Sequence, residues 1–190
     1  KSVETRKDYA RTWVGALNLA RLRHRAKDDV GAIEVLERAR KPDPQAWALV
    51  SFESELLRET QGPIQALHLV NGFVGQNWWS HEAWLAEGRL YAESNDVVQA
   101  VRALRYAALL DLHDISALNL LAQILLREDR LDEALSAQRR AVAREPYQPR
   151  QYLMLAEVLD KMGSATEAQK ARNAVVRLKA IAASPQIAAN

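Results

Sequence analysis

The chain has 190 residues, of which 48% are hydrophobic and 26% charged, so it is apolar enough to bury a core and too apolar for a disordered polymer. Its 26 basic and 24 acidic residues give a net charge of +2, which argues against a dedicated nucleic-acid binder, because such proteins usually carry a strong field of one sign. The lack of cysteine excludes disulfides and thiolate sites, and no apolar run approaches the roughly 18–20 residues of a membrane-spanning helix.

Small residues recur through the sequence at an interval of 34 positions. One series consists of the alanines Ala32, Ala66, Ala100, Ala134 and Ala168. A second series, twelve residues before each alanine, consists of Ala20, Ser54, Gly88, Ala122 and Ala156. A fixed period of this length is typical of stacked helical repeats, so function has to be sought on a surface rather than in a catalytic motif.

The period divides the chain into an N-terminal helix extension, five repeats and a short tail. The expected ranges are 1–12 for the extension, 13–46, 47–80, 81–114, 115–148 and 149–182 for the repeats, and 183–190 for the tail. The second helix of each repeat is expected to begin at one of five positions: Asp28, Gly62, Asp96, Arg130 and Ser164. Four of these residues favour a helix N-terminus, and Pro63 stands where proline loses no helical hydrogen bond.

The second and fifth repeats depart from the common pattern. In the second, Phe73 is flanked by Gly72 and Gly75, and because glycine disfavours a helix interior, we expect the helix to end early or bend there. The glycines either make room for Phe73, which we favour, or form a hinge. In the fifth, Gln169 and Arg172 replace apolar residues of earlier repeats, which is typical of a terminal repeat with a polar outer face.

The third repeat carries the most complete set of characteristic residues. They are Trp84, Gly88, Tyr91, Ala100 and Ala107. Over residues 13–182 the chain resembles the tetratricopeptide-repeat family. The resemblance implies an all-α fold, a right-handed α-solenoid (superhelix) of about five helix–turn–helix repeats. It also implies a scaffold or adaptor that holds a peptide or a partner's helix in a concave groove lined by the first helix of each repeat.

In this family the groove is lined by the fifth, ninth, twelfth and thirteenth positions of each repeat. The candidate peptide- or partner-binding residues at these positions are Leu17, Arg21, His24, Arg58, Leu85, Arg89, Asn119, Gln123, Leu126 and Arg127. Arginine offers forked donors to carboxylates and amides can hold a peptide backbone, so the expected ligand is a protein or peptide segment with acidic and apolar side chains. The alternative is that these are ordinary solvated charges, offset by Glu55, Glu59 and Glu93.

A well-known subgroup of the family captures the C-terminal carboxylate of chaperone tails with a lysine at the fifth position. The fifth positions here hold no lysine: they are Leu17, Ser51, Leu85, Asn119 and Leu153. This departure argues against chaperone-tail binding.

Two other parts of the sequence are candidate binding surfaces: a tryptophan pair and two basic clusters. Trp79, beside Trp78, is a candidate hot spot because tryptophan is enriched at binding interfaces, although packing under Phe73 is the favoured reading. The basic run Arg21–Lys27 and the cluster around Arg139 could contact phosphate, but stacking aromatic residues on the same face are missing, so a solvated surface is favoured over RNA binding.

Catalysis finds little support in the sequence. The four histidines, His24, His68, His81 and His113, lie far apart and form no metal-binding motif, and no nucleotide-binding or nucleophile motif occurs. We therefore expect no metal, no cofactor and no enzyme activity.

The sequence predicts a non-catalytic protein–protein interaction module. The alternatives are a regulatory or assembly domain of a larger polypeptide, such as an envelope or polysaccharide-machinery protein, and an RNA-binding helical repeat. The chain begins at Lys1 and is expected to be a piece of something longer. An exposed N-terminal face would allow a homodimer. No membrane insertion is expected, and the compartment stays open, with the cytoplasm favoured over the periplasm.

Overall fold

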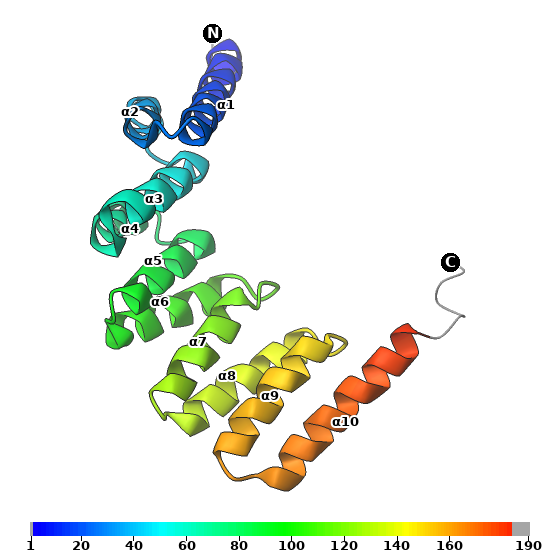
Figure 1. The fold of residues 1–190 in the computed structure, drawn as a ribbon. Coiled ribbons are helices and arrows are strands. Elements are labelled where there is room, and N and C mark those ends of the chain that lie inside the picture. The colour runs from blue at the N-terminus through cyan, green and yellow to red at the C-terminus, as the bar shows by residue number, and fades with distance from the viewer. Residues whose placement is uncertain (1, 184–190) are drawn as a thin grey trace. The chain divides into compact units, whose positions relative to one another are not determined.

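The computed structural model describes the backbone of residues 2–183 and the side chains of residues 13–183, and this part of the chain contains helices and no strands (Figure 1). The helices are α1 (Ser2–Arg25), α2 (Asp29–Arg40), α3 (Trp47–Gln61), α4 (Pro63–Gln76), α5 (His81–Glu93), α6 (Val97–Leu110), α7 (Ser116–Arg127), α8 (Leu131–Arg144), α9 (Pro149–Lys161) and α10 (Ala165–Ala182). The all-α fold is confirmed.

The chain forms two compact units, which we call unit 1 (residues 1–103) and unit 2 (residues 104–190). Unit 1 holds α1 to α5 and the beginning of α6, and unit 2 holds the rest of α6 and α7 to α10. Consecutive helices from α1 to α5 in unit 1 and from α7 to α10 in unit 2 pack against one another and are joined by short turns. The exact division into an extension, repeats and a tail stays a prediction, and residues 184–190 of the tail lie outside the described part.

Side chains and backbone geometry define most of the expected helix starts. The Asp28 carboxylate accepts a hydrogen bond from the Gly31 amide (2.9 Å), and the Asp96 carboxylate accepts one from the Gln99 amide (3.1 Å). Gly62 has φ +94° directly before Pro63, a conformation that favours glycine. Ser164 stands at its expected place but makes no side-chain cap. The turn chemistry thus marks where helices begin, but it does not always supply the cap bond.

The small residues of the two periodic series are where helices approach one another. All five alanines of the first series have an exposed fraction of 0%. The second series is also buried, from Ala20 at 0% to Ser54 at 7%. The period therefore reports helix packing, with small side chains where the backbones come close.

The prediction that the helix around Phe73 ends early is wrong. α4 continues to Gln76 through Gly72 and Gly75, and Phe73 packs in a core cluster with Val50 and Ala83. A Cβ atom placed on Gly72 or Gly75 would meet no other atom within 4 Å, so the glycines do not make room for Phe73 either. Both are exposed, and burial of Phe73 and its neighbours outweighs the low helix propensity of glycine.

Unit 1 buries two carboxylates at the seventh position of its second and third repeats. Glu53 is 2% exposed and accepts hydrogen bonds from Arg40 Nε (3.0 Å) and Nη2 (3.3 Å). Glu87 is 4% exposed, and in the orientation that satisfies both neighbours the Asn71 amide donates to Glu87 Oε1 (2.8 Å) and accepts from the Tyr91 hydroxyl (3.2 Å). Burial raises the pKa of Glu87, and the charge of Arg102 opposes this.

Unit 2 is built around an aliphatic core from α7, α8 and α9 that includes Leu118, Leu125 and Val158. The Arg144 guanidinium donates to the carbonyl oxygens of Ala108 (2.9 Å) and Asp114 (3.2 Å), which fastens the end of α6 to α8. Outside the core, two ion pairs of equal spacing, Arg105–Glu133 and Arg139–Glu167, join the second helices of successive repeats.

Candidate functional site

Unit 1 contains a cavity of about 370 Å³ between α3 and α5, which we call groove 1. Six of its lining residues occupy the positions that the family resemblance assigns to the groove: Ser51, Glu55, Arg58, Leu85, Arg89 and Glu93. Trp47, Ala86 and Leu90 supply apolar walls. Groove 1 thus collects charged residues around an apolar strip.

Arg58 and Arg89 of groove 1 differ in how far their charge is neutralised. The Arg58 guanidinium lies 3.7 Å from the carboxylate of Glu93 and 3.6 Å from that of Glu59. Arg89 is exposed and makes no ion pair with another described residue. Of the two, Arg89 is therefore the cation with charge to offer a ligand.

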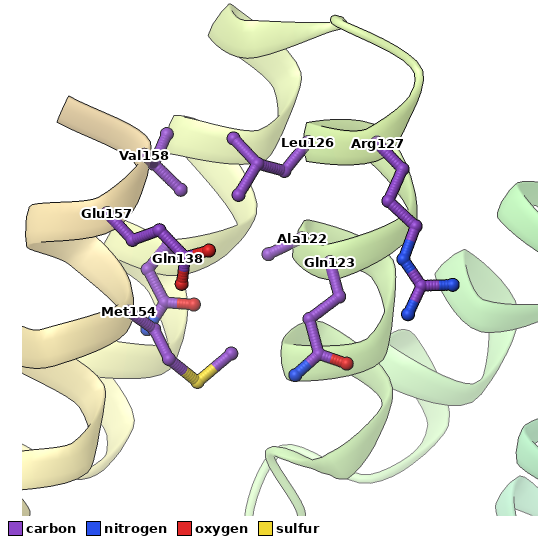
Figure 2. A pocket seen from close by; sticks show the side chains of 8 residues that line it. All are labelled: Ala122, Gln123, Leu126, Arg127, Gln138, Met154, Glu157 and Val158. Carbon is purple, nitrogen blue, oxygen red and sulfur yellow. The ribbon is translucent and has the colours of Figure 1, made fainter. Parts of the chain in front are cut away.

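Unit 2 contains a second cavity, of about 290 Å³, between α7 and α9, which we call groove 2. Figure 2 shows its lining side chains: Ala122, Gln123, Leu126, Arg127, Gln138, Met154, Glu157 and Val158. The predicted residues Gln123, Leu126 and Arg127 all belong to this set. Leu126 points across the cavity toward α9, and the Arg127 guanidinium lies on the other side of α7 from Glu157.

The floor of groove 2 contains a buried amide that the family positions do not predict. Gln138 is 0% exposed, and its Nε2 donates to the backbone oxygen of Gln151 (2.9 Å) and to Gln151 Oε1 (3.2 Å). Its own Oε1 has no hydrogen-bond partner. Its burial could have been predicted from the repeat alignment, because the same repeat position holds the fully buried Leu36, Val70 and Leu104 in the first three repeats.

The three predicted residues on α1 do not line either cavity. Leu17 is 7% exposed and packs in the core cluster that contains Leu49 and Leu56 of α3, and its part in binding stays a prediction. The first helix of the following repeat, α3, covers Leu17. The Arg21 guanidinium lies 5.9 Å from the centre of the Phe52 ring, and His24 Nδ1 lies 2.6 Å from the Asp29 carboxylate.

Asn119 and Trp79 also lie outside the two grooves. Asn119 is half-buried, and its Oδ1 has no hydrogen-bond partner. Trp79 is 55% exposed and contacts Trp78 edge-on, with ring centres 5.9 Å apart. Trp84 Nε1 donates to the Trp78 carbonyl (2.8 Å), which holds this turn in place. A role for Trp79 in binding stays a prediction.

Other kinds of site find no support in the described part of the chain. Residues 13–183 contain no group of histidine and acidic side chains arranged to hold a metal ion. None of the described helices combines the length and the apolar character that crossing a membrane requires.

The helix pairs, the buried small residues and the two grooves define a helical-repeat protein. Residues 115–148 match the sequence model of the tetratricopeptide repeat, and these are the residues assigned above to the fourth repeat. This stretch of the chain is therefore similar to a tetratricopeptide repeat, and the described part of the chain has an all-α fold built from helix–turn–helix pairs.

Solved structures share this fold at low sequence identity. MamA is 20% identical with a TM-score of 0.73, over 86% of this chain and 96% of MamA. PilF of Pseudomonas aeruginosa is 14% identical with a TM-score of 0.72, over 90% of this chain and 78% of PilF. YrrB, described as a TPR protein with an unusual peptide-binding site, is 15% identical with a TM-score of 0.66, over 86% of this chain and 84% of YrrB. A search of curated protein sequences finds no match.

Proposed function

We propose that this protein is a non-catalytic interaction module that holds a segment of a partner protein in groove 1 and groove 2. The observation that carries the proposal is that residues assigned to the groove by the family resemblance line cavities in both units. The peptide-binding site ascribed to YrrB, which has the same fold, adds support by analogy.

The charged residues that line groove 1 indicate which ligand side chains this groove accepts. In groove 1, Arg89 next to Leu85 and Leu90 suits a carboxylate flanked by apolar side chains, because a guanidinium binds carboxylates with two parallel hydrogen bonds. Arg58 contributes less, since Glu59 and Glu93 already offset its charge. The expectation of an acidic and apolar segment is therefore kept for groove 1 and centred on Arg89.

RNA binding receives less support from the side-chain contacts. Arg23 and Arg139 lie against the carboxylates of Asp28 and Glu167, and Arg144 donates to backbone carbonyls. These basic residues would have to give up their partners to bind phosphate. A fall in affinity that follows the logarithm of salt concentration with a slope of several units would instead indicate a nucleic-acid ligand.

Selection of peptides from a random displayed library tests the proposal. The wild-type protein is compared with Arg89→Glu in groove 1 and with Lys41→Glu as a matched charge reversal, since Lys41 is exposed and lies outside both cavities. We expect peptides with an acidic residue among apolar ones, retained by Lys41→Glu and weakened at least about tenfold by Arg89→Glu. Peptides that bind both variants equally well would contradict a ligand in groove 1.

A further inference from the structure

Groove 2 contains a hydrogen-bond acceptor that the protein does not use. The backbone carbonyl of Gln151 can only accept, so it fixes Gln138 Nε2 toward α9 and directs Gln138 Oε1 the other way. Figure 2 shows this oxygen facing the space between α7 and α9. Gln138 is completely buried, and a buried acceptor without a donor is unfavourable. A bound group with an N–H donor would remove this cost.

A second acceptor, the Glu157 carboxylate, lines the same cavity and carries a charge. Its natural partner on α9 would be Lys161, one helical turn further on. However, Lys161 Nζ donates to the Leu126 carbonyl (2.6 Å) and lies 3.6 Å from the Asp129 carboxylate. Glu157 makes no ion pair with another described residue, so its charge is available to a ligand.

The other lining residues of groove 2 are the polar Gln123 and Arg127, with the Arg127 guanidinium on the far side of α7 from Glu157, and four apolar residues. Ala122, Leu126, Met154 and Val158 surround the space above the amide. At about 290 Å³ the cavity is smaller than sites that enclose whole small-molecule ligands, roughly 300–1,000 Å³. Its size suits one long side chain, with an aliphatic stem along the walls and donors at the tip.

We propose that groove 2 is a receptor for a lysine side chain of the partner segment. The ammonium group donates to Gln138 Oε1 and to the Glu157 carboxylate, while the four-carbon stem packs against Leu126, Met154 and Val158. A guanidinium is planar and has five donors, which is more than these two acceptors satisfy. This inference rests on the proposed function and names the chemistry of one ligand residue.

The direct test uses a minimal probe, Nα-acetyl-lysine N-methylamide, and its norleucine counterpart, which has the stem without the charge. Binding is followed by NMR on the side-chain amide of Gln138 and the methyl group of Met154. We expect the lysine probe to shift both signals saturably at millimolar concentration, and the norleucine probe to bind at least about tenfold more weakly. Equal shifts with both probes, or no shift with either, would overturn the proposal.

Two variants locate the effect and guard against misfolding. Glu157→Gln keeps the shape of an exposed side chain and should weaken the lysine probe about tenfold. Asp132→Asn, an equal charge change on the exposed surface of α8 outside the cavity, should leave binding unchanged. Gln138→Leu should abolish the preference for lysine over norleucine. Unchanged lysine preference in both Glu157→Gln and Gln138→Leu would assign the signal to another site.

The same reagents separate this inference from the proposed function. If library-selected peptides depend on groove 2 but bind equally well with lysine replaced by norleucine, the lysine receptor is wrong and the interaction module stands. If the lysine probe binds as expected while no selected peptide depends on either groove, the receptor stands and the interaction module is wrong.

Discussion

The two units handle the burial of polar side chains in different ways. Unit 1 buries carboxylates, and Glu53 is matched by the guanidinium of Arg40. Beneath groove 2, unit 2 buries neutral amides, and one oxygen of Gln138 is left facing the cavity. In unit 1 the buried Glu53 is paired with a cation of the protein itself, whereas in unit 2 the unpaired acceptor is neutral and lines a cavity.

The buried glutamate of the third repeat, Glu87, lacks the arginine partner that Glu53 has in the second repeat. The position of Arg40 in the first repeat corresponds to Val74 in the second, so Glu87 has no arginine from the preceding repeat. Its hydrogen bond comes from Asn71, and its second oxygen has no hydrogen-bond partner. Two glutamates at the same repeat position are therefore expected to respond differently to substitution.

The largest expected effect is at the buried ion pair of unit 1. Arg40→Leu leaves the carboxylate of Glu53 buried without its partner and should lower the free energy of unfolding by about 3 kcal/mol, as measured by urea denaturation. The double variant Arg40→Leu/Glu53→Leu should recover most of that loss, because the unpaired charge is gone. A single variant as stable as the wild type would show that the pair does not organise unit 1.

Substitution of Glu87 is expected to raise the free energy of unfolding, whereas Arg40→Leu lowers it. Burial raises the pKa of its carboxyl in the folded protein above the ordinary value of 4.5, so between those two pKa values the folded state binds more protons than the unfolded state. Stability from this group is therefore lost as the pH rises from the ordinary pKa through the raised one. Glu87→Gln should stabilise the protein by about 1 kcal/mol at pH 7 and have little effect at pH 3, in parallel urea titrations.

Gln138→Leu should change stability only slightly, within about 1 kcal/mol, although the residue is fully buried. The substitution loses the hydrogen bonds to Gln151 but removes an unsatisfied oxygen and restores the aliphatic residue found at this position in the first three repeats. Thermal unfolding checks this. A loss as large as that of Arg40→Leu would mean that Gln138 is kept for stability rather than for a ligand.

The smallest expected effect is at the exposed ion pair between α8 and α10. Arg139 and Glu167 are both more than half exposed, and Arg139→Ala should cost less than about 0.5 kcal/mol. The free energy of unfolding of Arg139→Ala, measured by urea denaturation together with that of Arg40→Leu, gives the contribution of an ion pair that solvent screens. A comparable cost for the two would contradict the distinction between buried and exposed pairs.

The repeat architecture could be predicted from the sequence because the same helix packing recurs with a fixed period of 34 residues. The five alanines from Ala32 to Ala168 are completely buried, so a single pattern predicts the helix pairs, and the family resemblance adds which positions line the groove. Of the residues that the family resemblance assigns to the groove, Arg58, Arg89 and Gln123 line cavities, and their role in binding stays a prediction. Leu17 occupies an equivalent position but lies in a core cluster with Leu49 and Leu56 of α3, which the family positions do not indicate.

The floor of groove 2 could not be predicted in the same way. Gln138 belongs to a second helix, which the register assigns to the core, and nothing in its type says that one amide oxygen will meet a cavity. That outcome depends on which carbonyl its Nε2 reaches, and so on the packing of α8 against α9. Similarly, the engagement of Lys161 by Leu126 and Asp129, which leaves Glu157 unpaired, is a three-dimensional fact with no counterpart in spacing.

The most direct test of the central claim, that this protein works through its two grooves, is to map a library-selected peptide onto the protein by NMR. The account predicts that the largest chemical-shift changes occur at groove 1 and groove 2, including Arg89, Gln123 and the Gln138 side chain, while exposed residues such as Lys170 on α10 do not change. Changes concentrated on the second helices α2, α4, α8 and α10, with both grooves unaffected, would contradict it.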